Sequence, residues 1–201
     1  MKNQRQRSAN NMRRQGRLAI LRGAEGAQLF EFALVLPLLV VLVIGAVDFG
    51  GAYTLKDKLT NAARDASRIA VSQPNDLFNS LNTACNGVPC SVQSAATAVV
   101  NYLTSAGVNT CGMNPPATSP TAGPGPFAWT YSASAGCPGT MTIVVERQVL
   151  ATINGVTLTM TRVTVSHPFR WTFGNVVQLL APSSYPGIIT VSGVAVMQNL
   201  N

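Results

Sequence analysis

The sequence contains few of the side chains on which enzyme catalysis depends. Its 201 residues include one histidine, His167, and seven acids, of which five follow the long apolar segment: Asp48, Asp57, Asp65, Asp76 and Glu146. It has no glycine-rich phosphate loop, Gly-x-Ser-x-Gly elbow or paired-histidine zinc motif. His167 precedes a proline and has no carboxylate or nucleophile near it in sequence, so a structural role is favoured over that of a general base. We therefore expect no enzymatic activity, no catalytic residue and no cofactor.

An excess of positive charge is absent from most of the chain. The formal net charge is +7, but the tail from Lys2 to Arg22 holds seven basic residues and no acid, and the remainder balances seven basic against seven acidic groups. A basic flank beside an apolar segment is explained by membrane topology, because Lys and Arg resist translocation. We therefore expect no nucleic-acid binding, with attraction to the lipid bilayer as a secondary role of the tail.

Cysteine is scarce, and all of it follows the apolar segment, at Cys85, Cys90, Cys111 and Cys137. An even number on an exported domain predicts disulfides, with three pairings open. The alternative is a metal site, but Cys85 and Cys90 are more widely spaced than usual zinc pairs and the histidine is remote in sequence. We prefer Cys85–Cys90 with Cys111–Cys137 and no metal, because residues 86–89 supply a turn for the first pair.

One apolar segment, residues 29–47, has about the length needed to span hydrocarbon. Pro37 inside it is tolerated in membrane helices, where neighbouring groups compensate a kink. A buried core helix is the alternative, but the length and the basic flank favour a membrane span. A signal peptide cleaved after the segment is less favoured, because residues 45–48 form a poor cleavage site and a helical pattern continues beyond them.

The remaining pattern predicts two helices and three strands. The first helix continues to residue 73 with an apolar face formed by Leu55, Leu59, Ala62, Ala66 and Ile69. A second helix is expected over 91–106, capped by Ser91, and then a Pro/Gly-rich surface loop over 107–139. Phe127, Trp129 and Tyr131 alternate within this loop and can add a short strand. Strands are expected over 141–153, 156–165 and 187–197, the first two joined by an Asn154-Gly155 hairpin.

The predicted fold class is α+β: a long N-terminal membrane-spanning helix continues into an amphipathic helix and packs with a second helix on a small antiparallel sheet. The expected organisation has four parts. These are a basic cytoplasmic leader at 1–26 that is removed, a transmembrane segment at 27–48, an amphipathic extension at 49–73 and an exported domain at 74–201.

Glu31 is an unusual residue to find in an apolar segment. A charged carboxylate within hydrocarbon costs about 2.5–3.5 kcal/mol on the milder insertion scales. At the cytoplasmic end of the span Glu31 can instead lie at the interface, where it costs little. Alternatively, cleavage after Gly26 creates an α-amine on Ala27 that neutralises the carboxylate within the same chain or a neighbouring one.

The segment Gly26-Ala-Gln-Leu-Phe-Glu31-Phe32 resembles the processing motif of type IV prepilins, which has a glycine before the cut and a glutamate as the fifth mature residue. The wider stretch through Pro37, Asp48 and residues 59–68 resembles the TadE-like family. The proteins of that family are pseudopilins or minor pilins of the bacterial tight-adherence (Flp pilus) system.

The resemblance implies that Gly26 and Ala27 flank a cut made by prepilin peptidase. It implies that Glu31, Phe32, Pro37 and Asp48 serve membrane-helix assembly, and that the partners are pilins, other pseudopilins and the inner-membrane assembly platform. The implied location is single-pass in the bacterial inner membrane, with a cytoplasmic N-terminus, a periplasmic or extracellular domain, and entry into the pilus left open. The alternative is an uncleaved membrane-anchored envelope or surface protein with no filament role.

Overall fold

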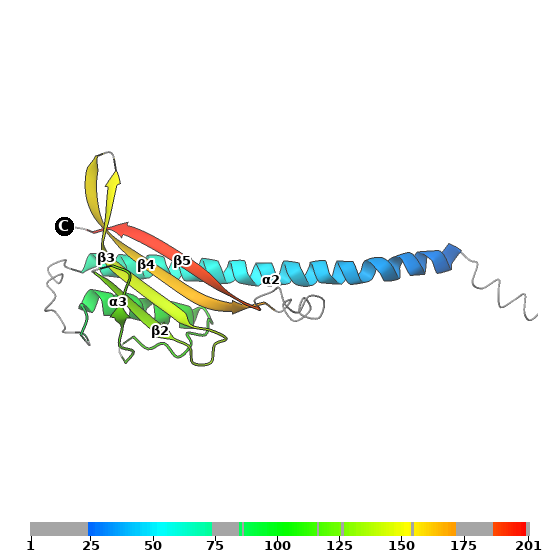
Figure 1. Cartoon of the computed structure of the whole chain (residues 1–201), viewed down its shortest axis with the longest axis horizontal. Coiled ribbons are helices and arrows are strands. Elements are labelled where there is room, and N and C mark those ends of the chain that lie inside the picture. The colour runs from blue at the N-terminus through cyan, green and yellow to red at the C-terminus, as the bar shows by residue number, and fades with distance from the viewer. Residues whose placement is uncertain are drawn as a thin grey trace, which may run out of the picture. The chain divides into compact units, whose positions relative to one another are not determined.

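The computed structural model describes residues 24–73, 85, 87–115, 117–125, 127–153, 155–171 and 187–199. The expectations for the leader up to residue 23 lie outside the described residues. In chain order the elements are α2 (Ala24–Ser72), α3 (Cys90–Ser105), β1 (Thr121–Ala122), β2 (Ala128–Ala133), β3 (Met141–Ile153), β4 (Val156–Arg170) and β5 (Ile188–Gln198). A long apolar helix, a second helix and an antiparallel sheet confirm the α+β class (Figure 1).

The chain divides into two compact units, Met1–Val47 and Asp48–Asn201. Helix α2 begins in the first unit, passes Pro37 without ending and, as predicted, continues beyond Asp48. It contains a segment long and apolar enough to cross a membrane, and the side chains described between residues 28 and 40 are exposed. By length and composition this part of α2 is a candidate membrane span.

The second unit contains a five-stranded sheet in the order β1-β2-β3-β4-β5, with every neighbouring pair antiparallel. The hairpin between β3 and β4 closes at the pair Ile153 and Val156, with Gly155 at a φ of 79°. Positive φ is what a tight hairpin turn needs at this position, and glycine adopts it without steric cost. Strand β4 continues to Arg170, past its predicted end at residue 165, because Phe169 and Arg170 pair with Ile189 and Ile188 of β5.

The segment 107–139 contains the short strand expected around Trp129 and Tyr131, and a second strand that was not predicted. It contains β1 and β2, and β2 pairs along its whole length with β3, from Ala128 opposite Glu146 to Ala133 opposite Met141. Tyr131 in β2 is fully buried, so this strand belongs to the core. Glycines and prolines on either side of β2 are typical of loops, and they made this strand harder to predict. The residues of β2 themselves alternate as strand residues do.

The core of the second unit is formed by α2, α3 and one face of the sheet (Figure 1). The buried stripe of α2 differs slightly from the predicted one, because Ile69 is 37% exposed while Ala63 and Ala70 are fully buried. Each residue turns a helix by about 100°, so the face through Ala66 continues at Ala70 and leaves Ile69 at its border. The fully buried members on α2 are Leu59, Ala62, Ala63, Ala66 and Ala70.

The second helix begins one residue earlier than predicted. Pro89 occupies the N-cap position with φ −57° and ψ 136°, and no side chain caps the first turn. The carbonyl oxygen of Pro89 accepts from the amides of Val92 and Gln93, and Ser91 is buried inside the helix. The predicted capping role of Ser91 is therefore wrong. A disulfide joins Cys90, the first helical residue, to Cys85.

Candidate functional site

The residues expected to be processed lie in the first turns of α2. Gly26 is the third residue of the helix, and a Cβ added there would meet nothing within 4 Å. Glycine weakens a helix by about 1 kcal/mol relative to alanine, and the first turn is where a helix frays most readily. The peptide bond after Gly26 is thus in the part of α2 that is easiest to unwind for a peptidase.

Glu31 lies four residues after Ala27 on the same helix. Residues four apart occupy the same face, about one turn from each other, so an amine created on Ala27 would lie within reach of the carboxylate. Phe32 follows on the exposed surface, with 62% of its side chain accessible in the isolated chain.

Pro37 and Asp48 have different surroundings. Pro37 lies inside α2, and since proline has no amide hydrogen, the carbonyl of Ala33 loses its usual helical partner. Asp48 is the first residue of the second unit and is only 6% exposed. The structure therefore groups Asp48 with the second unit and not with the apolar segment.

The distal end of α2 is held by a buried arginine that the sequence reading overlooked. Arg147, 1% exposed, lies at an irregularity in β3 between Glu146 and Val149, and its guanidinium donates a hydrogen bond to the carbonyl oxygen of Ala70 in the last turn of α2. The last carbonyls of a helix have no partners within it, and a cation there is favoured by the helix dipole. Burial lowers the pKa of Arg147, but a guanidinium that normally titrates above about 12 stays charged.

Asn199, which follows β5, holds the backbone at Arg147 in place through hydrogen bonds. Its side-chain amide donates to the carbonyl oxygen of Arg147 over 2.9 Å, and its side-chain oxygen accepts from the Thr161 hydroxyl over 2.5 Å. Its backbone amide donates to the carbonyl oxygen of Thr159 over 3.0 Å. The β3 irregularity, the end of β5 and the last turn of α2 are therefore joined by one buried polar network.

Two further contacts fix α2 against the rest of the second unit. Lys58 donates from its amine to the carbonyl oxygen of Ala106, the C-cap of α3, over 2.8 Å, so α2 caps the second helix. Gly193 of β5 faces the backbone of α2, and an added Cβ would lie 2.4 Å from the carbonyl carbon of Leu59 and from the amide nitrogen of Thr60. Only glycine allows the helix and the strand to approach this closely.

The structure contains the two disulfides with the pairing preferred from the sequence, Cys85–Cys90 and Cys111–Cys137, at Cα separations of 5.0 and 5.3 Å. His167 is remote from the second disulfide in sequence but not in space. Its Nε2 lies 2.8 Å from the carbonyl oxygen of Asn109 and 3.8 Å from Sγ of Cys111. The two sulfurs and this ring offer ligand atoms within 4.8 Å of one another. Because both sulfurs are bonded to each other, they present no thiolate to a metal.

A signal for Arg147 was present in the sequence. The residues at positions 141, 143 and 145 are buried, so position 147 continues the inward series of β3. An arginine in a series of inward-facing strand residues is expected to be buried and to need a hydrogen-bond acceptor. The close approach at Gly193 had no comparable signal, because it depends on which helix crosses β5.

Residues 26–68 match the family model described as TadE-like protein. The match begins at Gly26 and ends within the buried stripe of α2, so it confirms the resemblance for this helix. No curated protein and no solved structure gives a significant match.

Proposed function

We propose that this chain, whose helix α2 matches the TadE-like family over residues 26–68, is a pseudopilin or minor pilin that assists assembly of a Flp-type adhesive pilus or its secretion apparatus. The family match suggests a protein associated with the Tad/Flp system. The finer assignment is carried by one observation: the family match, the Gly26-to-Glu31 spacing and an apolar segment fit to cross a membrane coincide on one helix.

In this proposal the chain crosses the inner membrane once, with its basic tail in the cytoplasm and its second unit outside. Prepilin peptidase cuts between Gly26 and Ala27, which removes the charged leader. The new amine then neutralises Glu31 in the same chain or in a neighbouring pilin, so that the charge is not left alone in hydrocarbon. The domain carries no catalytic activity and needs no cofactor, as its sparse supply of titratable partners supports.

The test is N-terminal mass spectrometry of membrane-extracted protein from cells with active or disabled peptidase. Active peptidase should yield a chain that begins at Ala27, and disabled peptidase should leave the leader attached. Gly26→Val should block the cut because a β-branched side chain then flanks the scissile bond. Gly45→Val is the matched control, since Gly45 likewise has open space around its Cβ position.

An intact leader as the stable form in cells with active peptidase would remove the processing claim and favour the alternative, an uncleaved membrane-anchored envelope protein. Co-purification of the mature chain with pilins and the assembly platform tests the filament role separately. A cleaved chain that associates with neither would leave a processed anchor without a part in pilus assembly.

A further inference from the structure

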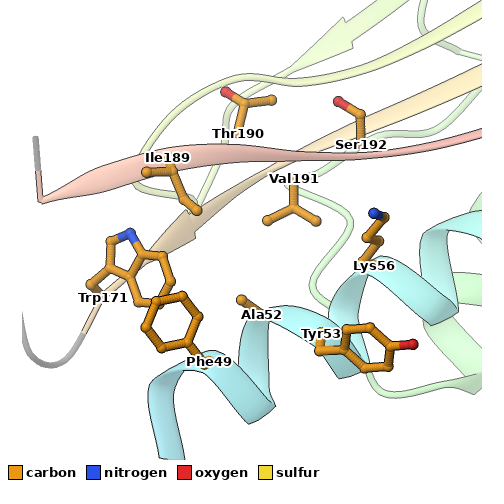
Figure 2. Close-up of a pocket in the computed structure, with 9 residues that line it drawn as sticks. All are labelled: Phe49, Ala52, Tyr53, Lys56, Trp171, Ile189, Thr190, Val191 and Ser192. Carbon is orange, nitrogen blue, oxygen red and sulfur yellow. The ribbon is translucent and has the colours of Figure 1, made fainter. Parts of the chain in front are cut away.

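A groove with a volume of about 400 Å³ lies between α2 and β5 in the second unit (Figure 2). From α2 it is lined by Phe49, Ala52, Tyr53 and Lys56, while Ile189 and Val191 of β5 point toward the helix. Trp171 lies at one end beside Phe49, and Lys56 rises from the helix at the other (Figure 2). The groove is therefore apolar along its length and cationic at a single end.

The apolar end is built on packed aromatic rings. The Trp171 ring packs edge-on against Phe49, with centroids 5.1 Å apart, and against Phe169, with centroids 5.3 Å apart. Trp171 is 8% exposed, and its indole N–H has no acceptor among the described residues. The nitrogen of this ring is itself buried, so Trp171 offers the groove the apolar surface of its ring and not a hydrogen-bond donor.

The groove begins just after the apolar segment in the sequence. Phe49 is two residues after Val47, the end of the apolar segment, and Lys56 is seven residues further along α2. Helical rise places these two side chains about 10 Å apart along the axis. The Lys56 side chain rises toward β5 at the end of the groove away from Phe49 (Figure 2). Along α2 the order is therefore apolar segment, aromatic ring and cation. This order matches that of acyl tail, interface and phosphate in a lipid monolayer.

We propose that this groove binds one phospholipid from the leaflet at which the domain emerges. Its phosphate pairs with Lys56, and the upper part of one acyl chain lies against Phe49, Trp171 and Ile189. The charge complementarity is simple, since the groove lining contains one cation and no carboxylate. The inference rests on the membrane-anchored part of the proposed function and not on a role in the pilus.

The experiment is native mass spectrometry of the full chain released from nanodiscs of phosphatidylcholine that contain a minor fraction of phosphatidylglycerol. The wild type should retain one lipid per chain. Lys56→Glu should lower the retained fraction at least tenfold, because it places an anion against the phosphate. Arg64→Glu is the matched control, as another exposed cation on α2 outside the groove.

A second pair of variants tests the apolar part. Val191→Phe fills the groove and should lower lipid retention, while Val194→Phe changes a 48% exposed residue of the same strand and should not. Lys56 is exposed, so Lys56→Glu keeps the test decisive if Val191→Phe fails to fold. In a Trp129→Phe background, brominated lipid should quench Trp171 fluorescence, and Lys56→Glu should weaken that quenching.

Lipid retention equal in wild type and Lys56→Glu would overturn the proposal, as would the release of a dimer without lipid, which would make the groove an interface between copies. Flotation with liposomes is measured on the same preparations. A chain that does not float refutes the anchor and the lipid site together, whereas one that floats and retains no lipid refutes the lipid site alone.

Discussion

Replacing Arg147 by methionine tests whether a buried cation stabilises the distal end of α2. Methionine is long and unbranched, so it keeps much of the buried volume while removing the charge and the hydrogen bond to Ala70. A hydrogen bond to a charged group contributes about 1.5–3 kcal/mol, and removing it also leaves the Ala70 carbonyl without this donor. Burying the guanidinium has its own desolvation cost, which methionine does not pay.

We expect the hydrogen-bond loss to exceed the relief of desolvation, because the guanidinium meets a helix terminus whose partial charge is opposite to its own. The predicted loss is about 2 kcal/mol in the free energy of unfolding, which corresponds to roughly a 30-fold change in the unfolding equilibrium. With a urea dependence of about 2 kcal/mol/M, the midpoint should fall by about 1 M.

The assay is urea unfolding of the full chain in detergent, followed by tryptophan fluorescence, together with hydrogen exchange of the last turn of α2. Arg170→Met serves as the control, because Arg170 is an exposed arginine at the end of β4. Exchange should accelerate most near Ala70 if the cap is lost there. An Arg147→Met protein that is as stable as the wild type, or more stable, would contradict this expectation. It would show that the desolvation cost of the buried guanidinium equals or exceeds the stabilisation from its hydrogen bond.

The other predictions concern packing, disulfides and Glu31. Gly193→Ala should cost about 1–3 kcal/mol, because its Cβ would meet the backbone of α2, whereas Gly50→Ala, with open space in a helix, should be neutral or stabilising; urea midpoints compare the two. Loss of Cys111–Cys137, which spans 26 residues, should cost about 1.5 kcal/mol more than loss of Cys85–Cys90, which spans 5, and equal midpoints for the two serine pairs would contradict the loop-entropy argument. Glu31→Gln should leave cleavage and membrane insertion intact but reduce co-purification with pilins, since breaking a buried ion pair costs about 3–5 kcal/mol; undiminished pilus output would leave Glu31 as an interfacial residue only.

The long helix and the two β3–β4 strands were predictable because each has a strong local signal. The span of α2 follows from composition, its amphipathic half from spacing, and the hairpin from Asn154-Gly155. The place of strand β2 in the core was not predictable, because its alternating residues lie between segments rich in glycine and proline that are typical of surface loops. The predicted N-cap at Ser91 was wrong for a different reason. Serine is a suitable N-cap residue, but the helix begins before it, with Pro89 at the N-cap position.

The residues of the candidate site also fall into two groups, those that the sequence identifies and those that only the fold brings together. Gly26 and Glu31 lie close together in one continuous segment, so the sequence alone identifies them and their spacing. The groove brings together Phe49, Lys56, Trp171 and Val191, which are separated by more than a hundred residues from end to end. Such a site depends on which strand α2 crosses, and no local pattern of residues contains that information.

The alanine-rich face of α2 has a consequence for the order of events in biogenesis. The sheet and α3 have no complete core without this face, because Leu59 and the alanines that follow it are fully buried against them. Folding of the second unit therefore depends on the later part of α2, and a protease that cut between residues 48 and 59 would release a domain that still carries this part of the helix. The proposed cut after Gly26 lies more than thirty residues before Leu59, outside the residues that form the core. In the proposed function, this cut and the formation of the two disulfides can therefore occur in either order.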